Sequence, residues 1–106
     1  MSTMHIATAT RSYARSVERV AAKTTDPVVT ERLLTAAIDL RIALELLPEG
    51  SPRQLFELRQ RAAAVAAIPT VGTSAQRALL AAHAVFAERA AEWALACGLG
   101  TRPAPV

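Results

Sequence analysis

The 106-residue sequence contains few of the residues that form disulfides and metal sites. Cys97 is its one cysteine, which excludes an internal disulfide, a cysteine-based zinc site and a haem attachment motif. The two histidines are His5 and His83. Metal sites in helical bundles use a glutamate three residues before the histidine, and neither of these histidines has one. We therefore expect neither a metal nor a cofactor.

Glycines are scarce, and no apolar run is long. The four glycines form no phosphate-binding loop, and no serine lies in a Gly-x-Ser-x-Gly motif. The longest apolar run, residues 62–68, is too short to cross a bilayer. Residues 1–6 contain no apolar core of a signal peptide. We expect a cytoplasmic protein that does not enter the membrane.

Alanine supplies much of the apolar content, since hydrophobic residues make up 52% of the chain and aromatic residues only 4%. An alanine-rich core lets helices approach closely, but each residue buries little area. The mean hydropathy of +0.25 is high for a lone monomer. This composition favours burial of surface in a dimer or against a partner.

Three helix starts have the residues of N-terminal caps. Asp26 precedes Pro27, and Ser51 precedes Pro52, with proline at the first helical position. Gln54 follows Ser51 by three residues and Gln76 follows Thr73 by three, so each glutamine can bond back to the N–H of its capping residue. These signals predict where the helices begin.

The sequence predicts an all-α fold of four amphipathic helices. The expected helices are 6–23, 27–47, 52–67 and 74–97, joined by connections of three to six residues. Short connections favour an antiparallel, up-down-up-down bundle. We expect a single domain over residues 1–98 and a flexible, disordered tail over residues 99–106.

The first helix has an apolar face and an opposite row of cations. Its predicted core residues are Ile6, Tyr13, Val17, Val20 and Ala21. A basic row recurs every four residues and comprises Arg11, Arg15, Arg19 and Lys23, the one lysine of a chain with a net charge of +3. Glu18 lies beside this row, where it can pair with a neighbouring arginine. The row could contact a phosphate backbone or an acidic partner.

The second helix has two apolar ridges, which predict burial on two sides. The predicted core ridge is Val29, Leu33, Ala36, Leu40, Leu44 and Leu47. The second ridge is Leu34, Ile38, Ile42 and Leu46, again at a spacing of four. Either this helix is the centre of the fold or the second ridge meets another chain, and we interpret it as a partner-binding surface.

The last two helices each have one core stripe. In the third it comprises Leu55, Leu58, Ala62 and Val65, with Arg53, Arg59 and Arg61 outside and Phe56 off the stripe. In the fourth it comprises Leu79, Ala82, Phe86, Ala90, Trp93 and Cys97.

Arg77 and His83 form the one pattern with a possible catalytic meaning. Their spacing resembles the Arg-x(4–6)-His motif of HEPN-type helical ribonucleases, which implies metal-independent RNA cleavage by a dimer. Ala78 differs from that family, which usually has a polar residue after the arginine. Six residues also place the two side chains about 120° apart around a helix. We favour the interpretation that Arg77 is solvated and that His83 lies at the margin of the core.

The sequence therefore favours a small, non-catalytic interaction module: an adaptor or regulatory protein acting through protein–protein contacts as a homodimer or with another protein. The alternative is a nucleic-acid-binding protein that uses the basic row, or an HEPN-like ribonuclease that uses Arg77 and His83.

Overall fold

The computed structural model describes residues 6–70, 72–96 and 98, and over these residues it has four helices and no strand. The helices are α1 (Ile6–Lys23), α2 (Pro27–Leu46), α3 (Pro52–Ala66) and α4 (Thr73–Ala96). The all-α prediction is confirmed. His5, Cys97 and the predicted tail over residues 99–106 lie outside the described residues.

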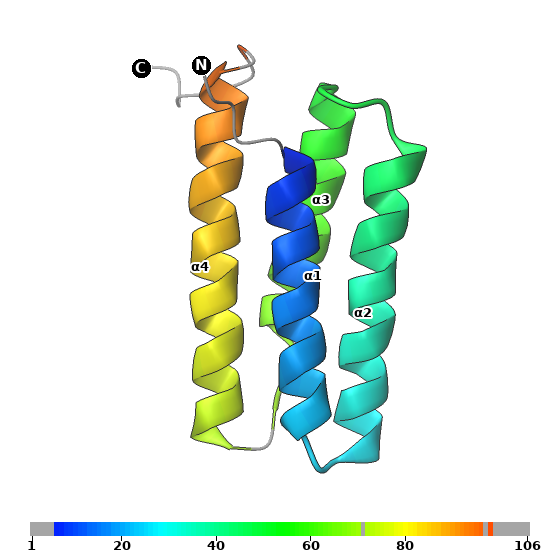
Figure 1. Cartoon of the computed structure of the whole chain (residues 1–106), viewed down its shortest axis with the longest axis vertical. Coiled ribbons are helices and arrows are strands. Elements are labelled where there is room, and N and C mark those ends of the chain that lie inside the picture. Colours follow the sequence, from blue (N-terminus) through cyan, green and yellow to red (C-terminus); the bar gives the residue numbers. More distant parts are fainter. Residues whose placement is uncertain (1–5, 71, 97, 99–106) are drawn as a thin grey trace.

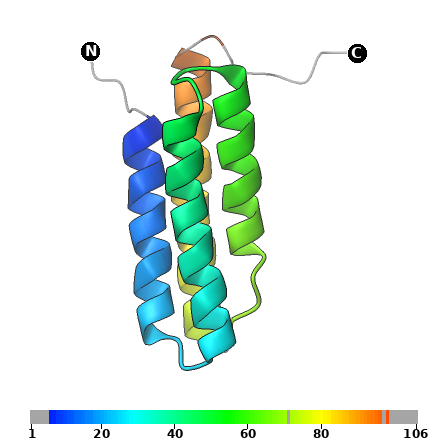
Figure 2. The same ribbon diagram turned by 90° about the vertical axis from the view of Figure 1, so that its right-hand side faces the viewer.

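The four helices stand side by side around one core (Figure 1). The chain descends through α1, rises through α2, descends through α3 and rises through α4 in this view. α1 packs against α2 and α4, and α3 packs against the same two helices. Figure 2 places α2 nearest the viewer and α4 behind it, so these two helices lie on opposite sides of the molecule.

The core is formed by the faces that helical periodicity predicts. Every predicted core residue of α1 and α3 is buried, as are Leu79, Phe86, Ala90 and Trp93 of α4. On α2 the prediction is partly wrong, because Ala37 and Ala43 are buried while Ala36 and Leu47 are only half-buried. Ala36 instead lines a groove between α2 and α3. Ala82 of α4 is also half-buried and packs at the edge of the core.

Tyr13 occupies the centre of the core. Its ring stacks on Phe86 with centroids 5.3 Å apart, and the ring of His83 lies 6.1 Å away. Its hydroxyl donates a hydrogen bond to the backbone carbonyl of Ala62. Burial raises the pKa of the Tyr13 phenol well above its usual range, so the hydroxyl stays protonated and remains a donor.

Two of the three predicted caps are confirmed. The Asp26 carboxylate accepts hydrogen bonds from the backbone N–H of Val28 at 2.9 Å and of Val29 at 3.5 Å. The Ser51 hydroxyl accepts a hydrogen bond from the N–H of Gln54 at 3.1 Å. Both capping residues have extended backbone, and each is followed by proline.

The glutamine partners were predicted wrongly. Gln54 accepts from the N–H of Gly50, one residue before the cap, and its amide also donates to the carbonyl of Leu44. Gln54 is buried, so it uses both ends of its amide to connect the α2–α3 loop to the end of α2. Gln76 accepts from the N–H and the hydroxyl of Thr70 rather than from Thr73. In both cases the loop before the helix folds back and brings an earlier donor within reach.

Candidate interaction surfaces

The second ridge of α2 faces outward. Leu34, Ile38, Ile42 and Leu46 are between 42% and 77% exposed, so within a single chain the ridge is not part of the core. The structure thus excludes burial of this ridge inside a single chain, and contact of the ridge with another chain stays a prediction. Four large apolar side chains along one helix form an apolar surface of a kind that marks contact sites.

Two glutamates share the outer face of α2 with the ridge. Glu31 precedes Ile38 by seven residues and Glu45 follows it by seven, which is about two helical turns in each direction. Both are exposed, and among the described residues neither forms an ion pair. The outer face of α2 is therefore apolar along its middle and acidic toward both ends.

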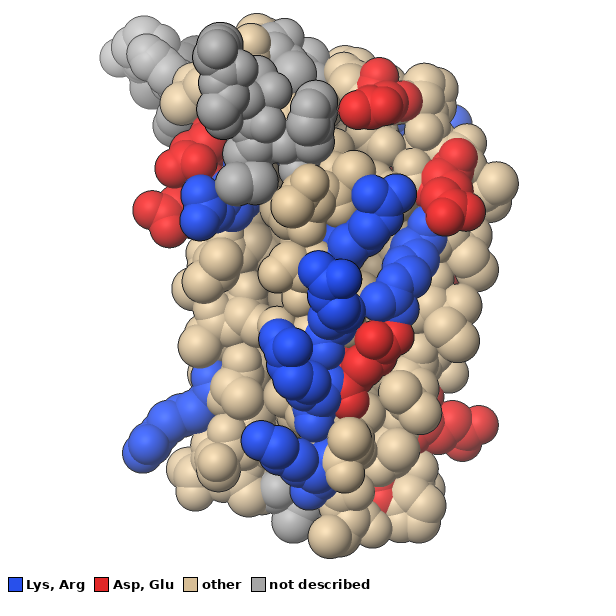
Figure 3. Space-filling model, viewed as in Figure 1, with Lys and Arg blue, Asp and Glu red and all other residues tan. Residues whose placement is uncertain are grey.

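The basic row of α1 is exposed as predicted. Lysine and arginine side chains run along the middle of the face shown in Figure 3, over α1. All four members of the row are exposed. The Arg19 guanidinium donates to the Ser16 hydroxyl at 3.2 Å, and no member forms an ion pair with a described carboxylate. The row keeps its positive charge available to a partner.

Glu18 pairs with Arg41 of α2 and not with an arginine of its own helix. Both guanidinium Nη atoms of Arg41 donate to the Glu18 carboxylate, one to each oxygen, and the second of these hydrogen bonds is 3.3 Å long. These bonds lower the pKa of Glu18, and the charge of Arg15 lowers it further. The pair links α1 to α2 and uses up the negative charge beside the basic row.

A groove runs along the boundary between α1 and α4. It consists of two hollows of about 540 and 230 Å³ that share Ser16, Ala82 and Val85. Small side chains line most of it, including Thr8, Ser12, Ser74, Ala75, Ala78 and Ala81. Arg19 and Lys23 line one end, Arg89 lines the other, and no aspartate or glutamate lines either hollow. Sequence reasoning missed this groove because it requires two helices to be placed side by side.

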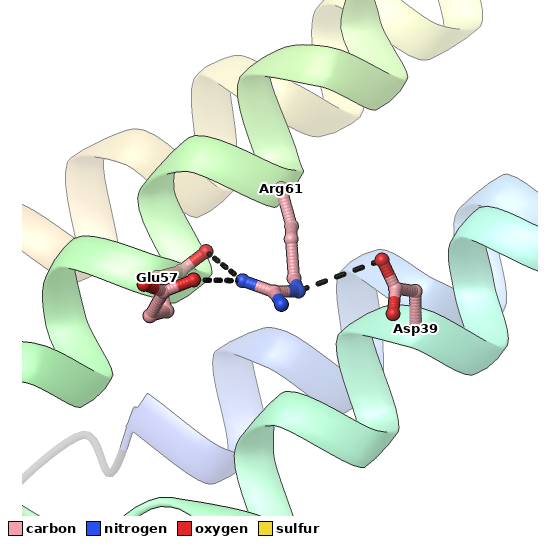
Figure 4. A network of polar contacts seen from close by, with 3 residues as sticks. All are labelled: Asp39, Glu57 and Arg61. Carbon is pink, nitrogen blue, oxygen red and sulfur yellow. Dashed lines mark hydrogen bonds and ion pairs between the residues drawn. The ribbon is translucent and has the colours of Figure 1, made fainter.

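A second groove, of about 450 Å³, lies between α2 and α3 and carries charges of both signs. Its Arg61 reaches the Glu57 carboxylate on the same helix and lies 3.5 Å, Nε to Oδ2, from Asp39 of α2 (Figure 4). Arg61 was predicted to be outside, but it is half-buried because these two carboxylates hold it against the protein. Its charge is neutralised, so this groove offers no net attraction for a charged ligand.

Arg77 and His83 lie in different surroundings. Arg77 is exposed near the beginning of α4, as its fifth residue. His83 is half-buried and faces the Tyr13 ring, at the margin of the core as the sequence predicted. Within one chain, no hydrogen bond or ion pair between described residues links them.

Neither a metal-ligating group nor a membrane span is found in the described part of the chain. No group of three or more His, Cys, Asp or Glu side chains lies close enough together there to hold a metal ion. None of the four helices has the length and apolarity needed to cross a membrane.

No family model matches the sequence, and no curated protein or solved structure matches it either.

Proposed function

We propose that this chain is a small, non-catalytic interaction module of the cytoplasm, built as an antiparallel four-helix bundle, which binds protein through the outer face of α2. The observation that carries the proposal is the exposed ridge of four aliphatic side chains. As an adaptor or regulatory protein, the chain would exert its effect by occupying a surface of its partner, which is a second copy or another protein.

The energetics of the ridge support this role. Complete burial of one leucine or isoleucine side chain is worth about 1.5–3 kcal/mol. Between 42% and 77% of each ridge residue is still exposed, so covering all four would release on the order of 4 kcal/mol before the cost of association. Single exposed aliphatic residues are common on protein surfaces, but a continuous row of four at this spacing is the pattern by which a helix binds a partner.

Nucleic-acid binding is the second candidate, and the exposed basic row favours it. The four cations of α1, spaced four residues apart, would bind nucleic acid through a contact that weakens steeply as the salt concentration rises. Base stacking has no support there, because Tyr13, the one aromatic residue of α1, is buried in the core. We therefore rank this function below protein binding.

Sedimentation velocity tests the proposal. The purified protein should associate as its concentration rises, and Ile38→Glu should shift it toward the monomer, because a charge would be buried in the interface. Phe56→Glu is the matched control, since Phe56 of α3 is 57% exposed and Ile38 is 55% exposed. The proposal fails if Ile38→Glu and Phe56→Glu sediment alike.

A further inference from the structure

The groove between α1 and α4 is suited to an apolar helix with acidic ends. Its walls are mostly alanine, serine and threonine, which leave room for larger side chains from outside. Val85 is 55% exposed and is a large hydrophobic residue of the groove that an incoming helix can contact. The cations stand at the two ends, with Arg19 and Lys23 at one and Arg89 at the other.

The charges at these ends are available to a partner. Arg19 and Lys23 have no carboxylate partner among the described residues. Arg89 has one, Glu92, at 4.0 Å, but both side chains are about half exposed, so this pair is weak. Two carboxylates supplied from outside would meet positive charge at both ends of the groove.

The outer face of α2 on another copy has the complementary features. It offers large aliphatic side chains in its middle, where the groove has small ones, and glutamates toward its ends, where the groove has cations. The lengths also agree. Glu31 and Glu45 are fourteen positions apart, about 21 Å along a helix, and the groove runs along α1 from Thr8 to Lys23, about 22 Å.

We infer that the α1–α4 groove of one copy receives the α2 ridge of a second copy, so that the chains associate head to tail. This inference rests on the proposed role of the ridge as an interface and names its occupant. α2 and α4 lie on opposite sides of the molecule (Figure 2), so two copies cannot satisfy both surfaces of each other. Association of this type continues into a ring or an open chain rather than stopping at a closed dimer.

A pairing of two α2 helices across a two-fold axis accounts for the charges less well. An antiparallel pair centred on the ridge would place Leu34 opposite Leu46 and Ile38 opposite Ile42. Glu45 would then lie opposite the uncharged Thr35, and Glu31 would lie at the level of Glu49, beyond the end of α2. Neither glutamate of the outer face would lie directly opposite a cation. The α1–α4 groove gives each of these glutamates an opposite charge instead.

Variants that close one surface at a time test the inference. Ile38→Glu disables the ridge, and Ala78→Trp fills the groove, where Ala78 is exposed on α4. Ala84→Trp is the matched control, because Ala84 is exposed on the same helix but does not line the groove. Arg19→Glu combined with Lys23→Glu reverses the charge of one end without adding bulk. Circular dichroism confirms that each variant is folded.

Sedimentation velocity should show species larger than a dimer for the wild type at high concentration, and these species should diminish as salt is added. Ile38→Glu, Ala78→Trp and the double charge reversal should each be monomeric, while Ala84→Trp should behave as the wild type. Mixing Ile38→Glu with Ala78→Trp should restore a complex of one copy of each, because the first retains its groove and the second its ridge.

Four results would overturn the inference. If Ala78→Trp associates as the wild type does while Ile38→Glu does not, the ridge is an interface but the groove is not its partner, and the proposed function stands. If the mixture of the two variants forms no complex, head-to-tail pairing is wrong. If the wild type stays monomeric at every concentration, or if neither variant changes its association, self-association through the ridge is wrong as well.

Discussion

The hydroxyl of Tyr13 donates a hydrogen bond to the backbone carbonyl of Ala62 over 2.9 Å, joining α1 to α3 through the middle of the core. The two residues are 49 positions apart in the sequence. The same Tyr13 ring contacts Phe86 and His83 of α4, so one side chain joins three helices.

We expect Tyr13→Phe to lower the free energy of unfolding by about 1 kcal/mol, because the ring stays and one buried hydrogen bond is lost. Tyr13→Ala should cost about 3–5 kcal/mol, since it also leaves a cavity. Urea denaturation of both variants measures the two effects. An unfolding midpoint of Tyr13→Phe equal to that of the wild type would show that this hydrogen bond contributes nothing to stability.

The Glu18–Arg41 pair should make stability depend on pH. Because the folded-state pKa of Glu18 lies below its unfolded value, the pair stabilises the fold at neutral pH, and this contribution disappears as the pH falls through the folded-state pKa. Both side chains are more than one third exposed, so Glu18→Gln should cost less than about 1 kcal/mol at neutral pH.

The difference between the wild type and Glu18→Gln should then vanish in acid, as chemical denaturation over a range of pH will show. Glu88→Gln is the control, because Glu88 is exposed on α4 and forms no ion pair with a described residue. A difference that persists unchanged in acid would mean that the glutamine acts through packing rather than through the lost charge.

The helix starts should respond differently to mutation. Asp26→Ala removes an acceptor of two backbone N–H groups and should cost about 1 kcal/mol in thermal unfolding. Gln76→Ala should cost a comparable amount, because Gln76 accepts two hydrogen bonds from Thr70. Thr73→Ala should change stability by less than about 0.5 kcal/mol. If Thr73→Ala loses more stability than Gln76→Ala, Thr73 caps α4 as the sequence predicted.

RNA cleavage provides a test of the HEPN resemblance. We expect the purified protein not to cut RNA in the presence of a chelator, and we expect His83→Ala to lower the melting temperature, because His83 is half-buried against Tyr13. Arg77→Ala should leave the melting temperature nearly unchanged, since Arg77 is exposed. Cleavage that disappears in both folded variants would establish the ribonuclease and overturn the non-catalytic interpretation.

The sequence by itself determined the features that depend on neighbours within a turn or two. The helix over residues 6–23, the Asp26 cap and the buried stripe of α3 follow from spacing, proline position and side-chain oxygens, all of which act locally. It also identified the second ridge of α2, because a spacing of four leaves those side chains on one side of any helix.

Only the tertiary structure decided which distant groups meet. Glu18 has several arginines nearby in the sequence, yet it pairs with Arg41, which lies 23 positions away. The amide of Gln54 finds the carbonyl of Leu44 because the loop between α2 and α3 turns back. The α1–α4 groove and the exposure of the ridge likewise depend on how the helices are placed around the core. Helical periodicity sets the direction of each side chain from its own axis, but packing between helices sets what lies in that direction.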